Sequence, residues 1–137
     1  MQSSAELVCV DPERVHEIWP HVAPLLKAAC IRTGLNAFAD IEADILSSRS
    51  LLWIAWNGQA IEAAAATVLI NSEIGKVCII TACGGSDMPR WLPLIAEIEN
   101  YARAEACARV RIYGRKGWLR MLDGYEQTHI IMDRELS

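Results

Sequence analysis

The order of the apolar patterns predicts an α/β (α+β) fold, a mixed and mainly antiparallel sheet with helices on both faces, in the order β-α-α-β-β-β-α-β-α-β. Three observations carry this prediction. Two segments with helical apolar spacing precede the first hairpin, an Asn-Gly pair joins two apolar strands, and a strand-helix-strand pattern follows as a parallel crossover. No linker, internal repeat or low-complexity segment interrupts the chain, so residues 1–137 are expected to form a single domain with one core.

The first part of the chain predicts one strand and two helices. Residues 5–10 alternate as a strand does, and Asp11-Pro12 provides an N-cap and a first-turn proline for the helix that follows. Apolar residues then repeat at three- and four-residue steps, although Pro20 and Pro24 are expected to kink or divide this helix. Residues 36–48 have the pattern of a second, short amphipathic helix.

A hairpin follows. Residues 51–56 (LLWIAW) form a buried strand pattern, Asn57-Gly58 suits a type I′ turn, and residues 59–70 are the return strand. A turn of two loop residues predicts these cross-strand pairs: Trp56 with Gln59, and Trp53 with Glu62.

The second part predicts a central strand and a crossover. Residues 77–83 are apolar on both faces, which is typical of an internal strand. The later elements are a helix at about 91–106, which Pro93 is expected to kink or to shift towards Arg90, a strand at 109–113, a short helix at 116–124 with Gly124 at its C-cap, and a final strand at 125–136.

Composition narrows the classes of function. The chain has 53% hydrophobic and 22% charged residues and a formal net charge of −4, which argues against a dedicated nucleic-acid binder. The first residues lack the pattern of a signal peptide and no apolar run suits a membrane span, so no membrane association and a cytoplasmic location are expected.

The spacing of the cysteines and histidines does not predict a metal site. The five cysteines are an odd number without CxxC spacing, and His16 and His21 lie five residues apart. Cys83 has no histidine close in sequence and is expected to be a packed thiol. Trp56 and Trp118 are the tryptophans that we expect in the wall of a pocket.

The segment after the central strand, "CGGSDMPRW", has two interpretations. Glycines before a helix let a backbone approach a phosphate, whose charge the helix N-terminus stabilises. Asp87 brings a negative charge, however, and Pro89 and Pro93 each remove a backbone donor. The alternative is a strand-to-helix connection in which the glycines permit a tight turn and Ser86 or Asp87 caps the helix.

The "CGG" after the fourth strand, together with "WLRMLDGYEQ" near the end, resembles the GNAT superfamily of acyl-CoA-dependent N-acetyltransferases. The chain also resembles the small, divergent GNAT-like proteins of bacteriophages and prophages. The resemblance implies acetyl-CoA as cosubstrate, lying between the fourth and fifth strands. The cofactor-binding residues that it implies are Ala82, Cys83, Gly84, Gly85, Ser86, Arg90 and Arg115.

Catalysis in this family implies a base for the amine and an acid for the departing thiolate. Many members carry the acid as a tyrosine where this chain has Arg120, and an arginine does not donate its proton at neutral pH. Tyr125 is therefore the candidate acid, with Tyr113 also near by sequence. Glu62 is the candidate base because partial burial in its apolar strand would raise its pKa; the alternative is a position that faces solvent.

Basic residues cluster late in the chain, without an acid among them: Arg109, Arg111, Arg115, Lys116 and Arg120. In an acetyltransferase part of this cluster would hold the nucleotide phosphates of coenzyme A. In a binding protein it would dock an acidic partner or nucleic acid. The third interpretation is a solvated basic face.

Two functions follow from the sequence. The first is an N-acetyltransferase that acts on an amine of a small molecule or a protein. The second is a GNAT-shaped protein without catalysis, which acts as a structural or assembly component with a virion or assembly partner. A homodimer is a further expected partnership.

Overall fold

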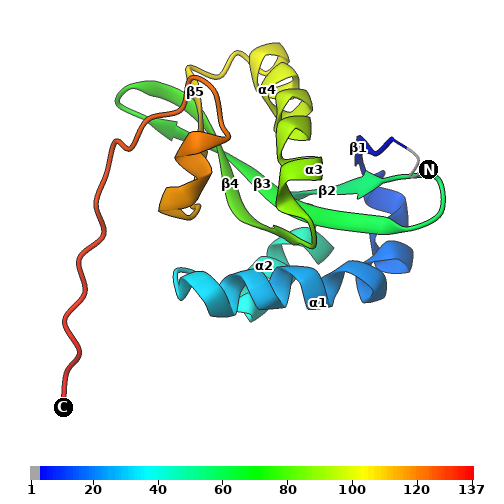
Figure 1. The fold of residues 1–137 in the computed structure, drawn as a ribbon, viewed down its shortest axis with the longest axis horizontal. Helices are drawn as coiled ribbons and strands as arrows, with labels where there is room; N and C mark the ends of the chain where they lie inside the picture. Colours follow the sequence, from blue (N-terminus) through cyan, green and yellow to red (C-terminus); the bar gives the residue numbers. More distant parts are fainter. Residues whose placement is uncertain (1–3) are drawn as a thin grey trace.

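The computed structural model describes residues 4–137, which form a five-stranded sheet with helices on both faces (Figure 1). The strands lie side by side in chain order: β1 (Glu6–Cys9), β2 (Leu51–Trp56), β3 (Ile61–Ser72), β4 (Gly75–Gly85) and β5 (Arg109–Ile112). Neighbouring strands among β1 to β4 are antiparallel to each other, and β5 is parallel to β4. The predicted mixed, mainly antiparallel sheet is confirmed.

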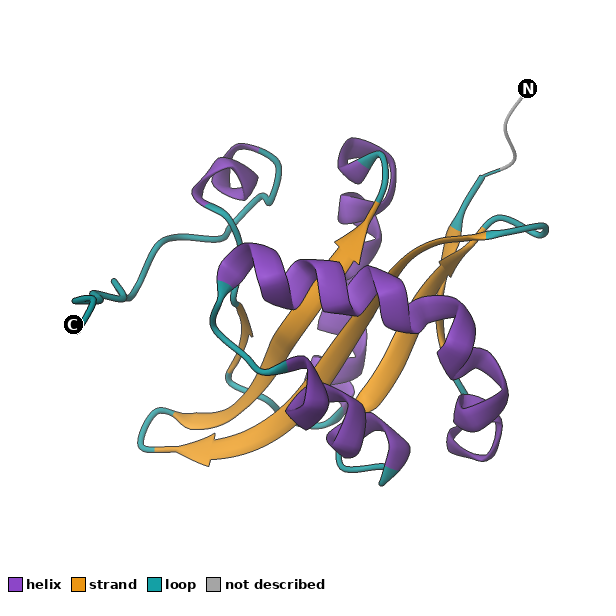
Figure 2. Ribbon diagram, turned by 90° about the horizontal axis from the view of Figure 1, so that it is seen from below, coloured by secondary structure: helices purple, strands orange, loops and turns teal. Residues whose placement is uncertain are grey.

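Two helices, α1 (Val15–Thr33) and α2 (Phe38–Leu46), cover one face of the sheet, and Figure 2 shows α1 crossing the strands. The chain enters α1 through a 3-10 turn, where the Asp11 carboxylate accepts a hydrogen bond of 2.9 Å from the Glu13 N–H, so the predicted N-cap is confirmed. The buried side chains of α1 are Val15, Trp19, Val22, Leu26, Ala29 and Cys30. Their helical spacing gives α1 one continuous apolar side against the sheet.

Of the two predicted effects of Pro20 and Pro24, a kink or a division of the helix, the division is wrong, because α1 is continuous from Val15 to Thr33. Both prolines lie on the exposed side of the helix. Carbonyl groups that lose their helical partner there can bond to water, while the opposite side stays packed on the sheet. The helix ends at Thr33, and Gly34 takes the left-handed C-cap conformation with φ of 65°.

The other face carries three short segments in place of the long helix predicted at about 91–106. They are α3 (Met88–Trp91), the 3-10 turn η2 (Leu92–Leu94) and α4 (Ile95–Ala104). Pro89 and Pro93 each occupy the first turn of a new segment, since neither supplies the backbone N–H that would continue the segment before it. The interruption of the helix that was expected at Pro93 is confirmed, and Pro89 stands at the start of the segment before it, α3.

The β2–β3 connection is longer than a two-residue turn. The Asn57 carboxamide oxygen accepts hydrogen bonds of 2.8 and 2.9 Å from the N–H groups of Gln59 and Ala60, which holds four residues in the loop. The observed pairs are Trp56 with Ile61 and Trp53 with Ala65, so the predicted pairs Trp56–Gln59 and Trp53–Glu62 are wrong. Glu62 is the extra residue of a β-bulge, because Ala55 already pairs with Ala63.

After β5 the chain forms the 3-10 helix η3 (Lys116–Arg120), shorter than the helix predicted at 116–124. Residues 125–136 were predicted as a strand, and this prediction is wrong: they have no regular secondary structure. Figure 1 shows this segment running away from the sheet. Alternation predicts that a segment can form a strand, but a strand also needs a neighbour, and none lies beside these residues in the described chain.

A second β-bulge lies in β4. Ala66 pairs with Ala82 and Thr67 pairs with Ile80, so Thr81 is an extra residue in β4. The bulge reverses the alternation of side chains along the strand. Ile80 packs in the core beside α4, whereas Ala82, two residues later, packs in the core beside α1.

Candidate functional site

The strands β4 and β5 separate at the bulge formed by Thr81. Their parallel pairing ends with Ile80 and Ile112, while β4 continues to Gly85. Within residues 4–137 no strand pairs with this last part of β4 on the β5 side. The side chain of Asn36 covers one backbone group there, donating a hydrogen bond of 3.0 Å to the Thr81 carbonyl.

A narrow crevice opens where the two strands separate. It is lined by α1, by β4 and by the segment after β5: Ala29, Cys30, Arg32, Thr33, Thr81, Ala82, Cys83, Tyr113, Gly114, Arg115 and Trp118. Its open volume is about 320 Å³ including the mouth, but its interior has room for only about one water molecule. The crevice beside Cys83 is therefore nearly closed.

Trp118 of η3 forms part of the crevice wall. It is 7% exposed and packs edge-to-face on Trp91, with ring centroids 6.5 Å apart. A Cβ at Gly114 would overlap the Trp118 ring, so only glycine allows the chain after β5 to pass so close. The Trp118 Nε1–H is buried and has no hydrogen-bond partner among the described residues.

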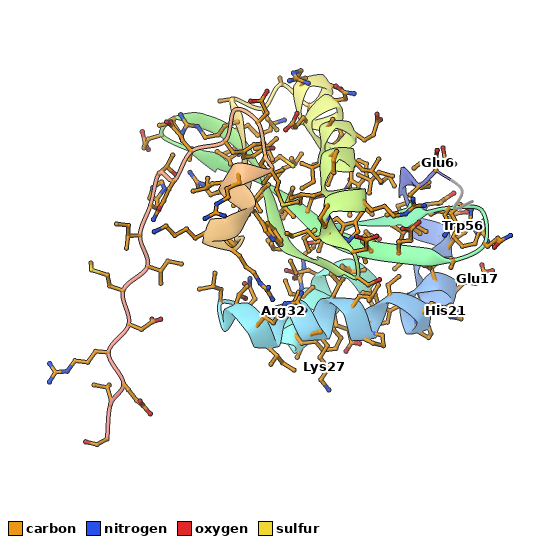
Figure 3. All side chains as sticks on the ribbon, viewed as in Figure 1. Glu6, Glu17, His21, Lys27, Arg32 and Trp56 are labelled. Carbon is orange, nitrogen blue, oxygen red and sulfur yellow. The ribbon has the colours of Figure 1, made fainter. Side chains whose placement is uncertain are left out.

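Two arginines give the crevice a positive charge. Arg115 follows β5, and Arg32 reaches over from the last turn of α1. Figure 3 shows the Arg32 side chain on the sheet side of α1, whereas Lys27 points away from the sheet. Guanidinium groups at the mouth of a concave site favour anions, phosphates in particular.

The thiol of Cys83 lies in the crevice wall but is not ionised. Burial raises its pKa to about 12, and the nearby Arg32 charge offsets only part of this effect. Since a thiolate is the nucleophilic form, Cys83 acts here as a packed side chain, as the sequence indicated.

The two glycines of "CGG" are explained by packing. Neither has a positive φ. A Cβ at Gly84 would lie 2.8 Å from the Leu25 carbonyl oxygen of α1, and one at Gly85 would overlap Glu62 and Ala63 of β3. The glycines therefore let α1 and β3 approach the end of β4.

The loop after Gly85 offers few donors to an anion. Asp87 is the residue before α3 and has φ of 55°, but its side chain makes no capping hydrogen bond, so the predicted side-chain cap is wrong. The left-handed backbone at Asp87 directs its carbonyl, not its carboxylate, to the Arg90 N–H, at 3.0 Å. The Ser86 carbonyl accepts from Trp91 Nε1 at 2.8 Å, and Pro89 has no N–H.

Glu62 and Arg90, a candidate base and a candidate cofactor ligand, contact each other. Arg90 donates through Nε and Nη2 to the two carboxylate oxygens of Glu62, the second at 3.0 Å, and the two side chains are 19% and 14% exposed. The hydrogen bond from Arg90 holds the pKa of Glu62 below its usual value, although desolvation opposes the change. The expected raised pKa is therefore wrong, because the bulge turns Glu62 towards Arg90.

Tyr125 lies apart from the crevice and contacts α4. Its hydroxyl donates a hydrogen bond of 2.7 Å to the Glu99 carboxylate. Burial, followed by this hydrogen bond, raises the pKa of Tyr125. Tyr113, the other tyrosine near the motif, lines the crevice.

The structure thus brings together part of the predicted site. Ala82, Cys83 and Arg115 share the crevice, whereas Gly84, Gly85, Ser86, Arg90, Glu62 and Tyr125 lie outside its wall. Sequence reasoning did not single out Arg32, because a basic residue in the last turn of a helix is already explained by the helix dipole. The expectation for Trp118 as a pocket wall is confirmed, whereas Trp56 packs beside α1 and α2.

Comparison with known proteins gives structural matches alone. No family model and no curated protein matches the sequence. An aminoglycoside acetyltransferase, meta-AAC0020, from an uncultured soil metagenomic sample is 8% identical with a TM-score of 0.70, covering 97% of each chain. A predicted acetyltransferase with acetyl-CoA from Clostridium acetobutylicum is 14% identical with a TM-score of 0.65, covering 96% of each chain.

The aminoglycoside N-acetyltransferase AAC(6')-Iy in complex with CoA is 13% identical, with a TM-score of 0.67 and coverage of 98% of this chain and 97% of that one. At such identities the likeness establishes the fold, and the chain has the GNAT fold of acetyltransferases. None of the helices described in residues 4–137 is long and apolar enough to cross a membrane. In the same residues no three His, Cys, Asp or Glu side chains gather as metal ligands would.

Gly84→Ala is expected to lower the free energy of unfolding by about 1–3 kcal/mol, because the new Cβ meets a backbone carbonyl that can move only with α1. Gly117→Ala is the matched control, since a Cβ there meets nothing within 4 Å. Urea denaturation measures both variants. Equal stability of the two would contradict the close approach of α1 to β4.

Glu62→Gln is expected to lower stability at pH 7 and to matter less in acid. The folded-state pKa of Glu62 is lowered, so its ionised form stabilises the fold fully above the usual pKa of 4.5, and this stability is lost as pH falls through the lowered value. Thermal melts of both proteins between pH 7 and pH 2 measure the difference. Asp44→Asn, which breaks the exposed Asp44–Arg49 pair, is the control and should show a much smaller difference. A Glu62→Gln difference that stays constant with pH would contradict the ion pair.

Proposed function

We propose that the chain is an acyltransferase that moves an acetyl group from acetyl-CoA to an amine. The observation that supports this most is the separation of β4 from β5 at the Thr81 bulge, with the resulting crevice flanked by Arg32 and Arg115. Backbone groups without a strand partner suit a thioester arm, and arginines suit the phosphates of the nucleotide.

The residues of the crevice fit coenzyme A in their chemistry. Ala82 and Cys83 line it with small side chains that let an extended ligand lie along β4, where it takes the place of the missing strand. Arg115 and Arg32 would hold phosphate oxygens at the two sides of the mouth. We assign Gly84, Gly85, Ser86 and Arg90 to the packing of β4 on α1 and β3, next to this site.

Trp118 determines access. Because the interior has room for about one water molecule, an arm of coenzyme A enters only if the Trp118 ring moves out from between the strands. Its unpartnered Nε1–H would then gain an acceptor on the ligand, which offsets part of the lost contact with Trp91.

The acyl transfer needs one proton donor at the crevice. Acetyl-CoA supplies an activated acyl group, which passes to the amine nitrogen as the carbon–sulfur bond breaks. The proton that the amine loses leaves to a base or to water, and the sulfur must gain one. We assign the donor to Tyr113, which lines the crevice, in preference to Tyr125, whose hydroxyl is bonded to Glu99. Glu62 stays a candidate base only through water, because Arg90 stabilises its charged form.

For the acceptor we propose a small-molecule amine, since structural neighbours include aminoglycoside acetyltransferases, one of them in complex with sisomicin. A protein amine is the alternative. A cytoplasmic location and a phage or prophage origin are further proposals, the second drawn from the resemblance that "CGG" and residues 118–127 carry.

A second candidate function is a GNAT-fold assembly protein without catalysis. Two observations favour it: Trp118 is packed in the wall of the crevice where a ligand arm would enter, and Arg120 stands where many family members have a tyrosine. Such a protein would keep Trp118 in place and bind no acetyl-CoA, which a titration decides.

Arg32→Glu is expected to weaken acetyl-CoA binding at least about tenfold, because it replaces a charged hydrogen bond to phosphate with repulsion. Lys27→Glu is the matched control, with the same charge change on the same helix but pointing away from the sheet (Figure 3). Isothermal titration calorimetry measures all three proteins. Absence of wild-type binding at millimolar acetyl-CoA would overturn the enzyme proposal in favour of the assembly protein. Equal effects of the two substitutions would overturn the placement of the site.

Tyr113→Phe is expected to lower kcat about 100-fold or more with little change in acetyl-CoA affinity, because it removes the proton donor and keeps the ring. Tyr125→Phe tests the rival residue and should lower stability through the lost bond to Glu99 with kcat near wild type. A thiol-release assay on a panel of amines gives both values. The opposite ranking of the two variants would assign the proton donor to Tyr125.

A further inference from the structure

A second pocket lies on the face of the sheet opposite to α1, beneath α3 and α4 (Figure 1). It is lined by Leu7 of β1, by Ala63, Ala64 and Ala65 of β3, by Cys83 of β4 and by side chains of α3 and α4. Its volume is about 250 Å³ including the mouth, and its interior has room for about one water molecule. A space of this size accommodates about one methyl group of a ligand.

The pocket exists because small side chains meet across the strands at this point. Ala63 pairs with Gly85, and Ala65 pairs with Cys83. Cys83 faces this side of the sheet because the Thr81 bulge reverses the alternation along β4. The side chains of α3 and α4 pack over these positions and leave part of the space above them open.

The lining of the pocket offers little to a water molecule. The Trp91 Nε1–H is already bonded to the Ser86 carbonyl at 2.8 Å, and the Cys83 thiol is only a weak hydrogen-bonding group. The backbone of β3 is paired with β2 on one side and with β4 on the other. A buried water needs two to four polar partners, so this pocket favours an apolar group.

Cys83 connects this pocket to the crevice between β4 and β5. Among the described residues it is the one that lines both spaces. The two tryptophans on either side of it are also in contact, because Trp91 of the pocket packs edge-to-face on Trp118 of the crevice. The pocket is therefore directly behind the crevice wall at the end of β4.

We propose that the enzyme transfers propionyl groups as well as acetyl groups, and that it binds propionyl-CoA more tightly, with the additional carbon in this apolar pocket. The inference rests on the proposed function, in which the thioester lies along Ala82 and Cys83. From there the acyl chain passes the Cys83 side chain once Trp118 has moved away from Trp91. The chemistry is unchanged: the carbon–sulfur bond breaks as the carbon–nitrogen bond forms, the amine loses one proton and the sulfur gains one.

Isothermal titration calorimetry with acetyl-CoA, propionyl-CoA and hexanoyl-CoA tests the pocket without an acceptor amine. Propionyl-CoA should bind about fourfold more tightly than acetyl-CoA, which is the effect of burying one CH₂ group, and hexanoyl-CoA should bind less tightly because the pocket is too short. Acetyl-CoA binding at least as tightly as propionyl-CoA, or hexanoyl-CoA binding most tightly, would overturn this inference alone. Absence of binding by all three would overturn the proposed function with it.

Two substitutions change the size of the pocket in opposite directions. Ala65→Val fills it and should abolish the advantage of propionyl-CoA over acetyl-CoA. Ile98→Val removes one methyl group from its wall and should raise the affinity for butyryl-CoA, relative to propionyl-CoA, about fourfold. Ile45→Val is the matched control, the same change at a buried position on the other face of the sheet, and should alter neither ratio.

Each ratio compares two dissociation constants measured on one protein, so a lower folded fraction in a destabilised variant affects both constants equally. The ratios therefore report the shape of the pocket and not the stability of the variant. If both pocket variants kept the ratios of the wild type, the pocket would not hold the acyl chain.

Discussion

The extra residue in β4 is the constraint from which the candidate site follows. Because Thr81 has no partner in β3, the side chains after it exchange faces, so that Ala82 meets α1 and Cys83 meets the core beside α4. The bulge also increases the local twist of β4, and the short β5 does not follow it beyond Ile112. The crevice lies at the gap that results, and the Trp118 ring forms part of its wall.

The position of α1 ties this gap to its charges. Gly84 is where the helix comes closest to β4, and the same approach brings the Arg32 guanidinium within 3.2 Å of the place that a Gly84 side chain would occupy. A larger residue would push the helix and Arg32 away together. The glycines that resemble a phosphate loop therefore contribute to the proposed anion site indirectly, because they allow the close approach of the helix that carries Arg32.

Most elements could be predicted from the sequence because their patterns are local: helical spacing in α1 and α2, apolar runs in β2 and β4, and prolines at the breaks before α4. The two β-bulges, at Glu62 and Thr81, could not be predicted in this way. Glu62 and Thr81 lie in runs of small or β-branched residues whose alternation reads equally well with one residue more or less. The predicted register of the hairpin is wrong because the Asn57 side chain accepts two hydrogen bonds within the turn, and these bonds stabilise a longer loop.

The basic cluster shows how neighbours in sequence separate in space. Arg115 follows the end of β5 and turns into the crevice, while Arg109 and Arg111 lie on the open face of the strand before it. One run of charge in the sequence therefore divides between two surfaces of the molecule, the wall of the crevice and the outer side of β5. Alternation along β5 separates Arg109 and Arg111 from Val110 and Ile112, so the charges stay off the core that the apolar pair covers.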